Sequence, residues 1–101
     1  MWLTQAVTVA AGNPVVTAAL SGLRCGQTTQ MIITATPASG ATIAGFRINW
    51  GDGSPEEFSD SPTQTHVYPA CGAATPYLVT IMAEDSVGRR TTITLNANTT
   101  P

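Results

Sequence analysis

The sequence predicts an all-β domain, an immunoglobulin-like β-sandwich of about seven strands. Three observations support this prediction. Short β-prone runs recur along the chain, turn residues such as Gly, Pro, Asn and Asp separate them, and no stretch has the 3.6-residue apolar period of an amphipathic helix. The 101 residues suffice for one domain with its own core, so residues 1–101 are expected to form a single sandwich.

Each expected strand is a β-prone run bounded by turn residues. The N-terminal region, residues 1–20, is expected to contain two strand segments, because a Gly-Asn-Pro turn signal at 12–14 interrupts it. At the other end, residues 96–101 are polar and are expected to form a tail. The expected strands cover residues 4–10, 15–20, 28–36, 44–50, 56–58, 63–68, 76–84 and 89–95.

The strand at residues 44–50 carries the clearest pattern in the chain. Phe46, Ile48 and Trp50 alternate with polar residues, so they share one face of the strand and are expected to enter the core. The Gly-Asp-Gly sequence at 51–53 then supplies residues that tolerate a positive φ and an Asp that can bond nearby backbone N–H groups. A tight turn is therefore expected directly after this strand.

The strand at residues 76–84 has two faces of different character. One face is apolar and is expected to enter the core; it consists of Tyr77, Val79, Ile81 and Ala83. Leu78 and Met82 lie on the opposite face, on either side of Thr80. Two interpretations of this outward pair are open. Either it marks a protein interface, or a neighbouring loop or a bend of the strand covers it.

Composition excludes several classes of partner. Charged residues make up 10% of the chain, its four basic residues are all arginines, and its net charge is −2. This balance provides no basic surface for nucleic acid or anionic lipid. No apolar run reaches the length of a membrane span, and the first residues lack the basic start and apolar core of a signal peptide. The chain is therefore expected either to be exported within a larger protein or to reach a surface by assembly.

Four short motifs follow one another along the chain. They are WGDGS at 50–54, THVY at 65–68, YLVTI at 77–81 and EDSVG at 84–88. In this order and near these spacings they resemble the PKD domain, an immunoglobulin-like module named after polycystic kidney disease. The resemblance covers roughly residues 28–96 and implies a structural role for the matching residues, which are Trp50, Gly51, Asp52, Gly53, His66, Tyr68 and Tyr77.

Two cysteines distinguish this sequence from most members of the family that it resembles. Cys25 lies in the connection before the strand at 28–36, and Cys71 lies in the connection before the strand at 76–84. In an immunoglobulin-like sandwich these connections lie at the same end, so a Cys25–Cys71 disulfide is one interpretation and two separate buried thiols are the other. A bridge would close a loop of about 46 residues, stabilise the fold by roughly 4 kcal/mol and indicate an oxidising environment.

Few residues offer chemistry for a site. Asp52, with Glu56 and Asp60 nearby, is a weak candidate for binding a metal such as calcium; the alternative is that Asp52 caps its own turn. His66 is the only histidine, and neither a nucleophile nor metal-ligand spacing accompanies it. We expect His66 to be a hydrogen-bonded packing residue beside Trp50 or Tyr68. No catalytic residue and no cofactor are expected.

The expected function is that of a non-enzymatic immunoglobulin-like module. One hypothesis is a decoration or accessory subunit displayed on a virion or another surface assembly, with capsid or appendage subunits as protein partners. The absence of lysines, which often protect sheet edges from pairing, favours this hypothesis because it suggests that an edge is covered. The alternative is a PKD spacer or binding domain of a secreted multidomain adhesin or hydrolase, in contact with protein or glycan. Both hypotheses place the chain outside the cell or on a virion surface.

Overall fold

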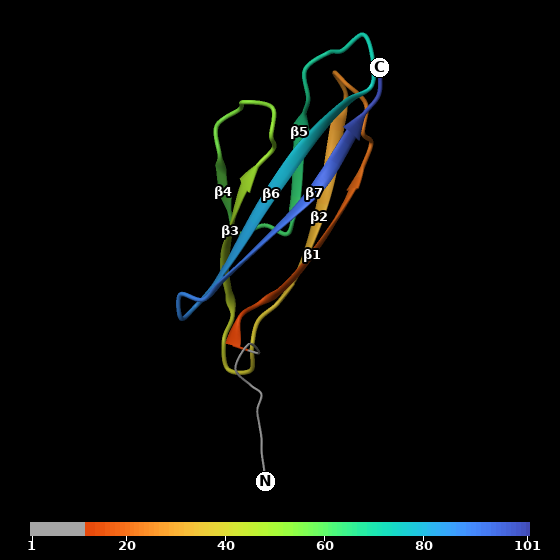
Figure 1. Ribbon diagram of the computed structural model, residues 1–101. Helices are drawn as coiled ribbons and strands as arrows, with labels where there is room; N and C mark the ends of the chain where they lie inside the picture. The colour runs from red at the N-terminus through yellow and green to blue at the C-terminus, as the bar shows by residue number, and fades with distance from the viewer. Residues whose placement is uncertain (1–11) are drawn as a thin grey trace.

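The computed structural model describes residues 12–101, which form two antiparallel β-sheets packed face to face (Figure 1). One sheet has the strand order β1-β2-β5 and the other the order β4-β3-β6-β7. The all-β sandwich predicted from the sequence is confirmed, and the described residues include no helix long and apolar enough to cross a membrane. The segment expected as a strand at 4–10 lies outside the described residues. The strands are β1 (Val15–Ser21), β2 (Thr28–Thr36), β3 (Ile43–Asn49), β4 (Glu57–Ser59), β5 (Thr63–Val67), β6 (Thr75–Asp85) and β7 (Arg90–Thr99).

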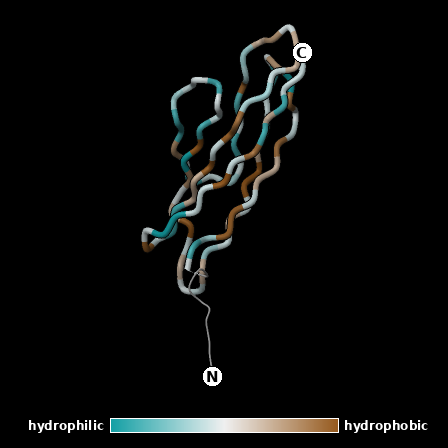
Figure 2. The backbone as a smooth tube through the Cα atoms, viewed as in Figure 1, coloured by the Kyte–Doolittle hydropathy of each residue, from teal (hydrophilic) through white to brown (hydrophobic). Residues whose placement is uncertain are grey.

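The core lies between the sheets and consists of alternate residues from facing strands. Hydrophobic positions recur along the long strands, as the two-residue period of a half-buried strand requires (Figure 2). Tyr77 is partly buried at the margin of this core. The buried hydrophobic residues are Val16, Met31, Ile33, Phe46, Ile48, Trp50, Tyr68, Val79, Ile81, Ala83 and Ala97.

The last strand is longer than the sequence pattern indicated. The expectation that residues 96–101 form a polar tail is wrong for most of this segment, because β7 continues through Thr99. Ala97 and Thr99 are fully buried, and the Thr99 hydroxyl donates a hydrogen bond to the Thr75 carbonyl at 2.6 Å. The inward alternation thus continues with small or polar side chains, which do not register as an apolar pattern.

A disulfide fastens the end of the sandwich where β7 finishes. Cys25 and Cys71 are bonded, with their Cα atoms 5.7 Å apart, so the bridge joins the β1–β2 connection to the β5–β6 connection. The same loop holds the end of the chain. The Cys25 N–H donates to the Thr100 carbonyl at 2.9 Å, and the Thr100 N–H donates to the Leu23 carbonyl at 3.1 Å. The disulfide therefore supports both connections and the end of β7.

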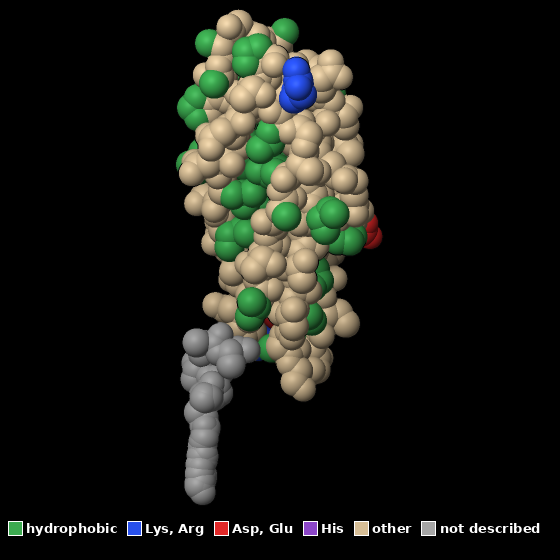
Figure 3. All heavy atoms as spheres, turned by 90° about the vertical axis from the view of Figure 1, so that its right-hand side faces the viewer, with side chains coloured by type: hydrophobic (Ala, Val, Ile, Leu, Met, Phe, Trp, Pro, Cys, Tyr) green, Lys and Arg blue, Asp and Glu red, His purple; other side chains and the backbone are tan. Residues whose placement is uncertain are grey.

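Charge is distributed unequally between the two sheets. The strands of the three-stranded sheet contain no Asp, Glu, Lys or Arg. Ion pairs lie instead along the four-stranded sheet, between Arg47 and Glu56 and between Arg90 and Glu84. Figure 3 shows the side of the molecule on which β1 and β7 lie, where few charged side chains are in view. The outer faces of the two sheets therefore differ in charge.

Loss of the disulfide is expected to destabilise the domain. Replacing both cysteines by serine (Cys25→Ser with Cys71→Ser) should lower the free energy of unfolding by about 3–4 kcal/mol, because the unfolded chain regains the entropy of an open loop. Urea unfolding followed by tryptophan fluorescence measures this change. The wild-type protein should show a similar loss in a reducing agent, whereas the double variant should be insensitive to it. A loss below about 1 kcal/mol would contradict the stabilising role.

Candidate functional site

The turn after β3 brings the chain into close contact with β6. Gly51 has a φ of +84°, and a Cβ atom on it would lie 2.2 Å from the Leu78 carbonyl oxygen. Only glycine fits here, because a side chain would clash with the backbone of β6 and would strain a left-handed conformation. Asn49, the last residue of β3, accepts a hydrogen bond from the Gly51 N–H at 2.9 Å. The turn is therefore held against the sheet from which it emerges.

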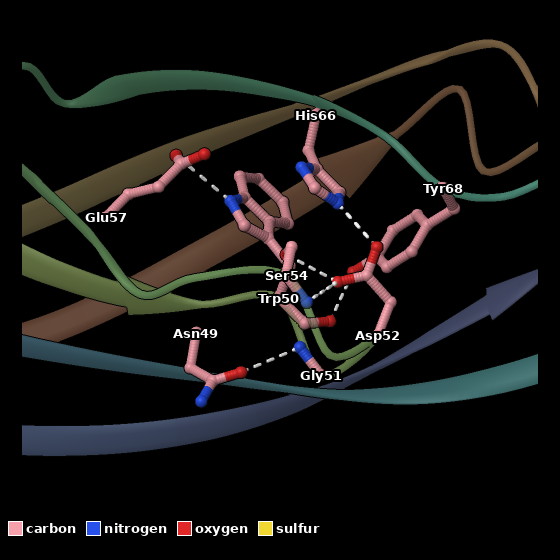
Figure 4. A network of polar contacts seen from close by, with 8 residues as sticks. All are labelled: Asn49, Trp50, Gly51, Asp52, Ser54, Glu57, His66 and Tyr68. Carbon is pink, nitrogen blue, oxygen red and sulfur yellow. Dashed lines mark hydrogen bonds and ion pairs between the residues drawn. The ribbon is translucent and has the colours of Figure 1, made fainter.

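The Asp52 carboxylate links this turn to the opposite sheet (Figure 4). One oxygen accepts hydrogen bonds from the N–H and the hydroxyl of Ser54, and the other lies 2.8 Å from Nε2 of His66 on β5. The side chains of Asp52 and His66 are only 5% and 12% exposed, so this contact is shielded from water. Burial opposes ionisation of the Asp52 carboxyl, but the hydrogen bonds from Ser54 and His66 outweigh it and hold its pKa below its usual value.

Aromatic rings pack around this carboxylate–imidazole contact. Trp50 is fully buried and stacks on His66, with ring centroids 4.7 Å apart and planes 7° from parallel. Tyr68 meets the edge of Trp50 at 6.1 Å and stacks on Tyr77 at 4.5 Å. The Tyr68 hydroxyl donates to the Trp50 carbonyl at 2.9 Å, and burial together with the charge of Asp52 raises the pKa of Tyr68. We call Trp50, Asp52, His66, Tyr68 and Tyr77 the Trp50 corner.

The Trp50 corner has the residue types of a catalytic site but not the geometry. In a Ser-His-Asp triad the imidazole lies between the hydroxyl and the carboxylate. Here the carboxylate lies in the middle, because the Ser54 hydroxyl donates to Asp52 and His66 contacts the other oxygen of the same carboxylate. The buried indole N–H of Trp50 is also satisfied, by the Glu57 carboxylate at 3.1 Å. The polar groups of the corner therefore bond to one another in an order that differs from that of a Ser-His-Asp triad.

The three acids considered as metal ligands have separate roles in the structure. Asp52 is engaged within the Trp50 corner, and a Glu56 carboxylate oxygen lies 3.4 Å from Nε of Arg47. Asp60 is exposed in the β4–β5 connection. Among residues 12–101, no group of three His, Cys, Asp or Glu side chains could hold a metal ion. The hydrogen bonds of Asp52 correspond to the turn-capping alternative rather than to a ligand set.

The outer face of the four-stranded sheet is a second candidate site. Leu78 and Met82 point outward from β6; Leu78 is 54% exposed and Met82 is half-buried. The strand register places Arg47 of β3 between Met82 and Phe58 of β4, and the Arg47 guanidinium carbon lies 4.7 Å from the centroid of the Phe58 ring. Sequence reasoning missed Phe58, because a three-residue strand is too short to show a period. Its place within an acidic, turn-rich stretch is the signal that could have marked it as exposed.

The fold and the Trp50 corner define the class of this protein as an immunoglobulin-like β-sandwich module. The sequence model of the PKD domain matches residues 7–97, and the chain belongs to the PKD family. Two solved PKD1 domains share the fold. The domain of Vibrio anguillarum Epp has a TM-score of 0.66 and 17% identity, covering 87% of this chain and 94% of that chain. The domain of the Vibrio cholerae metalloprotease PrtV has a TM-score of 0.67 and 21% identity, covering 88% and 99%. A comparison with curated proteins finds no match.

Acidification is expected to destabilise the domain through Asp52. Because its pKa is lower in the folded than in the unfolded chain, the Asp52 carboxylate contributes stability above about pH 4 and loses it as the pH falls through the folded value. The Asp52→Asn variant should be less stable than wild type at pH 7 but should lose less stability between about pH 5 and pH 2. Thermal unfolding midpoints across this range test the expectation.

The exposed carboxylate of Asp60 provides a matched control for this experiment. The Asp60→Asn variant should follow the wild-type curve at every pH, because among residues 12–101 its exposed carboxylate has no buried hydrogen-bonded partner of the kind that Asp52 has in His66. If Asp52→Asn and wild type instead lost stability in parallel on acidification, Asp52 would not contribute to the acid sensitivity of the fold.

Proposed function

We propose that the chain is a non-catalytic PKD module that spaces neighbouring domains and contacts protein within an extracellular multidomain protein. The observation that carries this proposal is the hydrogen bonding within the Trp50 corner. Its polar groups are bonded to one another instead of facing an open site. PKD domains are generally non-catalytic modules, and membership of this family agrees with such a use of the corner.

The positions of the terminal strands support a role as a spacer. The chain enters β1 at one end of the elongated sandwich and leaves β7 at the other end (Figure 1). This arrangement suits a domain connected in series with its neighbours. The disulfide between Cys25 and Cys71 fastens the exit end, and such bridges form and persist in oxidising compartments. It therefore supports an extracellular location.

The comparisons favour this function over the decoration of a virion. Both structural relatives are PKD1 domains. One of them belongs to a metalloprotease, so there the PKD domain is one module of a larger protein. The absence of lysines agrees with any partner that covers a sheet edge and does not single out a capsid or an appendage. The hypothesis of a domain within a multidomain protein is therefore preferred to that of a surface-assembly subunit.

A protein partner is preferred to a glycan. The apolar side chains of Phe58, Leu78 and Met82 lie on one outer face together with Arg47, and aromatic residues, Met and Arg are the types enriched at protein interfaces. The face opposite, on the three-stranded sheet, has no charged strand residue to orient a partner. The four-stranded sheet is therefore the proposed contact surface.

The parent gene and its product test the proposed function. The open reading frame that contains this chain should encode an export signal and at least one further domain. Antibodies against the chain should detect the product in the culture supernatant of the source organism, and mass spectrometry after alkylation should find Cys25 and Cys71 bonded. Recovery of the chain as a repeated subunit of purified particles would contradict the proposal and would restore the decoration hypothesis.

A further inference from the structure

A groove on the outer face of the four-stranded sheet lies apart from the Trp50 corner. Phe58, Arg47 and Met82 form one row across β4, β3 and β6, because Arg47 pairs with both of the others. In the next row, Gly45 pairs with Glu84. The space above Gly45 is walled by the side chains of the first row and by Glu84, and it has a volume of about 370 Å³.

Gly45 lies beside the irregularity in the pairing of β3 with β6, but neither its φ nor its neighbours exclude a side chain. Gly45 is not among the glycines with a positive φ, and the only atom near an added Cβ would be the Ser59 carbonyl oxygen at 3.4 Å, an ordinary contact distance. Glycine in a strand interior costs roughly 0.5–1 kcal/mol relative to alanine, and it often marks a bulge or a place where a ligand or another backbone approaches closely. The missing side chain leaves the floor of the groove open.

The apolar wall of the groove is formed by Phe58 and Met82 at the two ends of the first row. Phe58 is 69% exposed, the Arg47 guanidinium covers one face of its ring, and a Glu56 carboxylate oxygen lies 3.4 Å from Nε of Arg47. Burial of such an exposed aromatic ring by a partner is favourable, since aromatic residues are enriched among the residues that carry most of the binding energy at interfaces. Met82, which is flexible and polarisable, can adapt to the shape of an inserted group.

The backbone beside the groove includes a stretch of strand that is unpaired on one side. β4 pairs only with residues 46–48 of β3, and then leaves the sheet at Ser59. On that side, no described strand pairs with residues 43–45 of β3, and the register with β6 shifts between Ile43 and Gly45. An unpaired stretch at a sheet edge is a template for an additional strand.

We propose that this groove binds an extended polypeptide segment of a partner protein. The backbone of the segment adds to β3 at residues 43–45, and one apolar side chain fills the space above Gly45. Two positions further along the segment, on the same face, a basic side chain reaches Glu84. It can replace Arg90 there at little cost, because the Glu84–Arg90 pair is exposed and 3.7 Å long.

A glycan fits these observations less well than a peptide. Sugar rings stack on an open aromatic face, whereas Arg47 already covers one face of Phe58. The open edge of β3 offers main-chain hydrogen bonds, which a polypeptide matches in register and a sugar does not. The inference rests on one part of the proposed function, namely that the module contacts another protein. Its test does not depend on whether the parent protein is exported.

Selection from a phage library of random twelve-residue peptides on the immobilised 101-residue chain tests this inference. The enriched peptides should share an apolar residue with a basic residue two positions away. Their affinity would be measured by fluorescence titration of synthetic copies. It should fall at least about tenfold for Phe58→Ser, which removes the apolar wall, and for Gly45→Val, which fills the floor of the groove.

Two controls keep the test decisive. Ile32→Ser removes a side chain that is 51% exposed on the opposite sheet and should leave the affinity unchanged. Thermal unfolding midpoints identify any loss of the fold; Phe58→Ser changes a mostly exposed residue and remains informative if Gly45→Val unfolds. Failure to enrich peptides, or equal affinity for wild type and Phe58→Ser, would overturn the inference. The inference would also be overturned if the wild-type chain bound neutral oligosaccharides on a glycan array and Phe58→Ser abolished this binding, because the groove would then be a glycan site.

Discussion

The contact between Asp52 and His66 joins the two sheets of the sandwich, and the rest of the corner is arranged around it. Asp52 extends from the turn after β3 and His66 lies on β5 of the other sheet, with 2.8 Å between their side chains. Trp50 stacks on the imidazole, and its carbonyl accepts the Tyr68 hydroxyl. The contact is shielded from water, so removal of one partner would leave one polar atom of the other without its hydrogen bond, Oδ2 of Asp52 or Nε2 of His66.

A polar network and a disulfide therefore stabilise the same end of the molecule. The Trp50 corner ties β3 to β5, and the disulfide between Cys25 and Cys71 ties the neighbouring connections to the end of β7. Trp50, Asp52, His66 and Tyr68 bond and pack against one another in this support. The proposed contact surface is instead the outer face of the four-stranded sheet, which carries the exposed aromatic ring, the groove and the ion pairs.

Much of the fold could be predicted from the sequence, because a half-buried strand imposes a two-residue period that single residues reveal. The bounds of β2 and the inward set of β6 follow directly from this alternation. The pattern fails where inward residues are small or polar, as at Ala97 and Thr99 of β7. It also cannot reveal the groove, since the meeting of Phe58, Arg47 and Met82 depends on the register between three strands. The hydrophobic pattern determines which face a residue takes, but the pairing of particular residues across three strands also depends on the geometry of the connecting turns.

A double-mutant cycle on Asp52 and His66 tests the central claim most directly. The free energy of unfolding in urea at pH 7 would be measured for wild type, Asp52→Asn, His66→Gln and the double variant. If this contact joins the sheets, the two substitutions should be coupled by about 1–3 kcal/mol, with the double variant losing less than the sum of the single losses. Additivity within about 0.5 kcal/mol would contradict the claim, because it would mean that the two side chains support the fold independently.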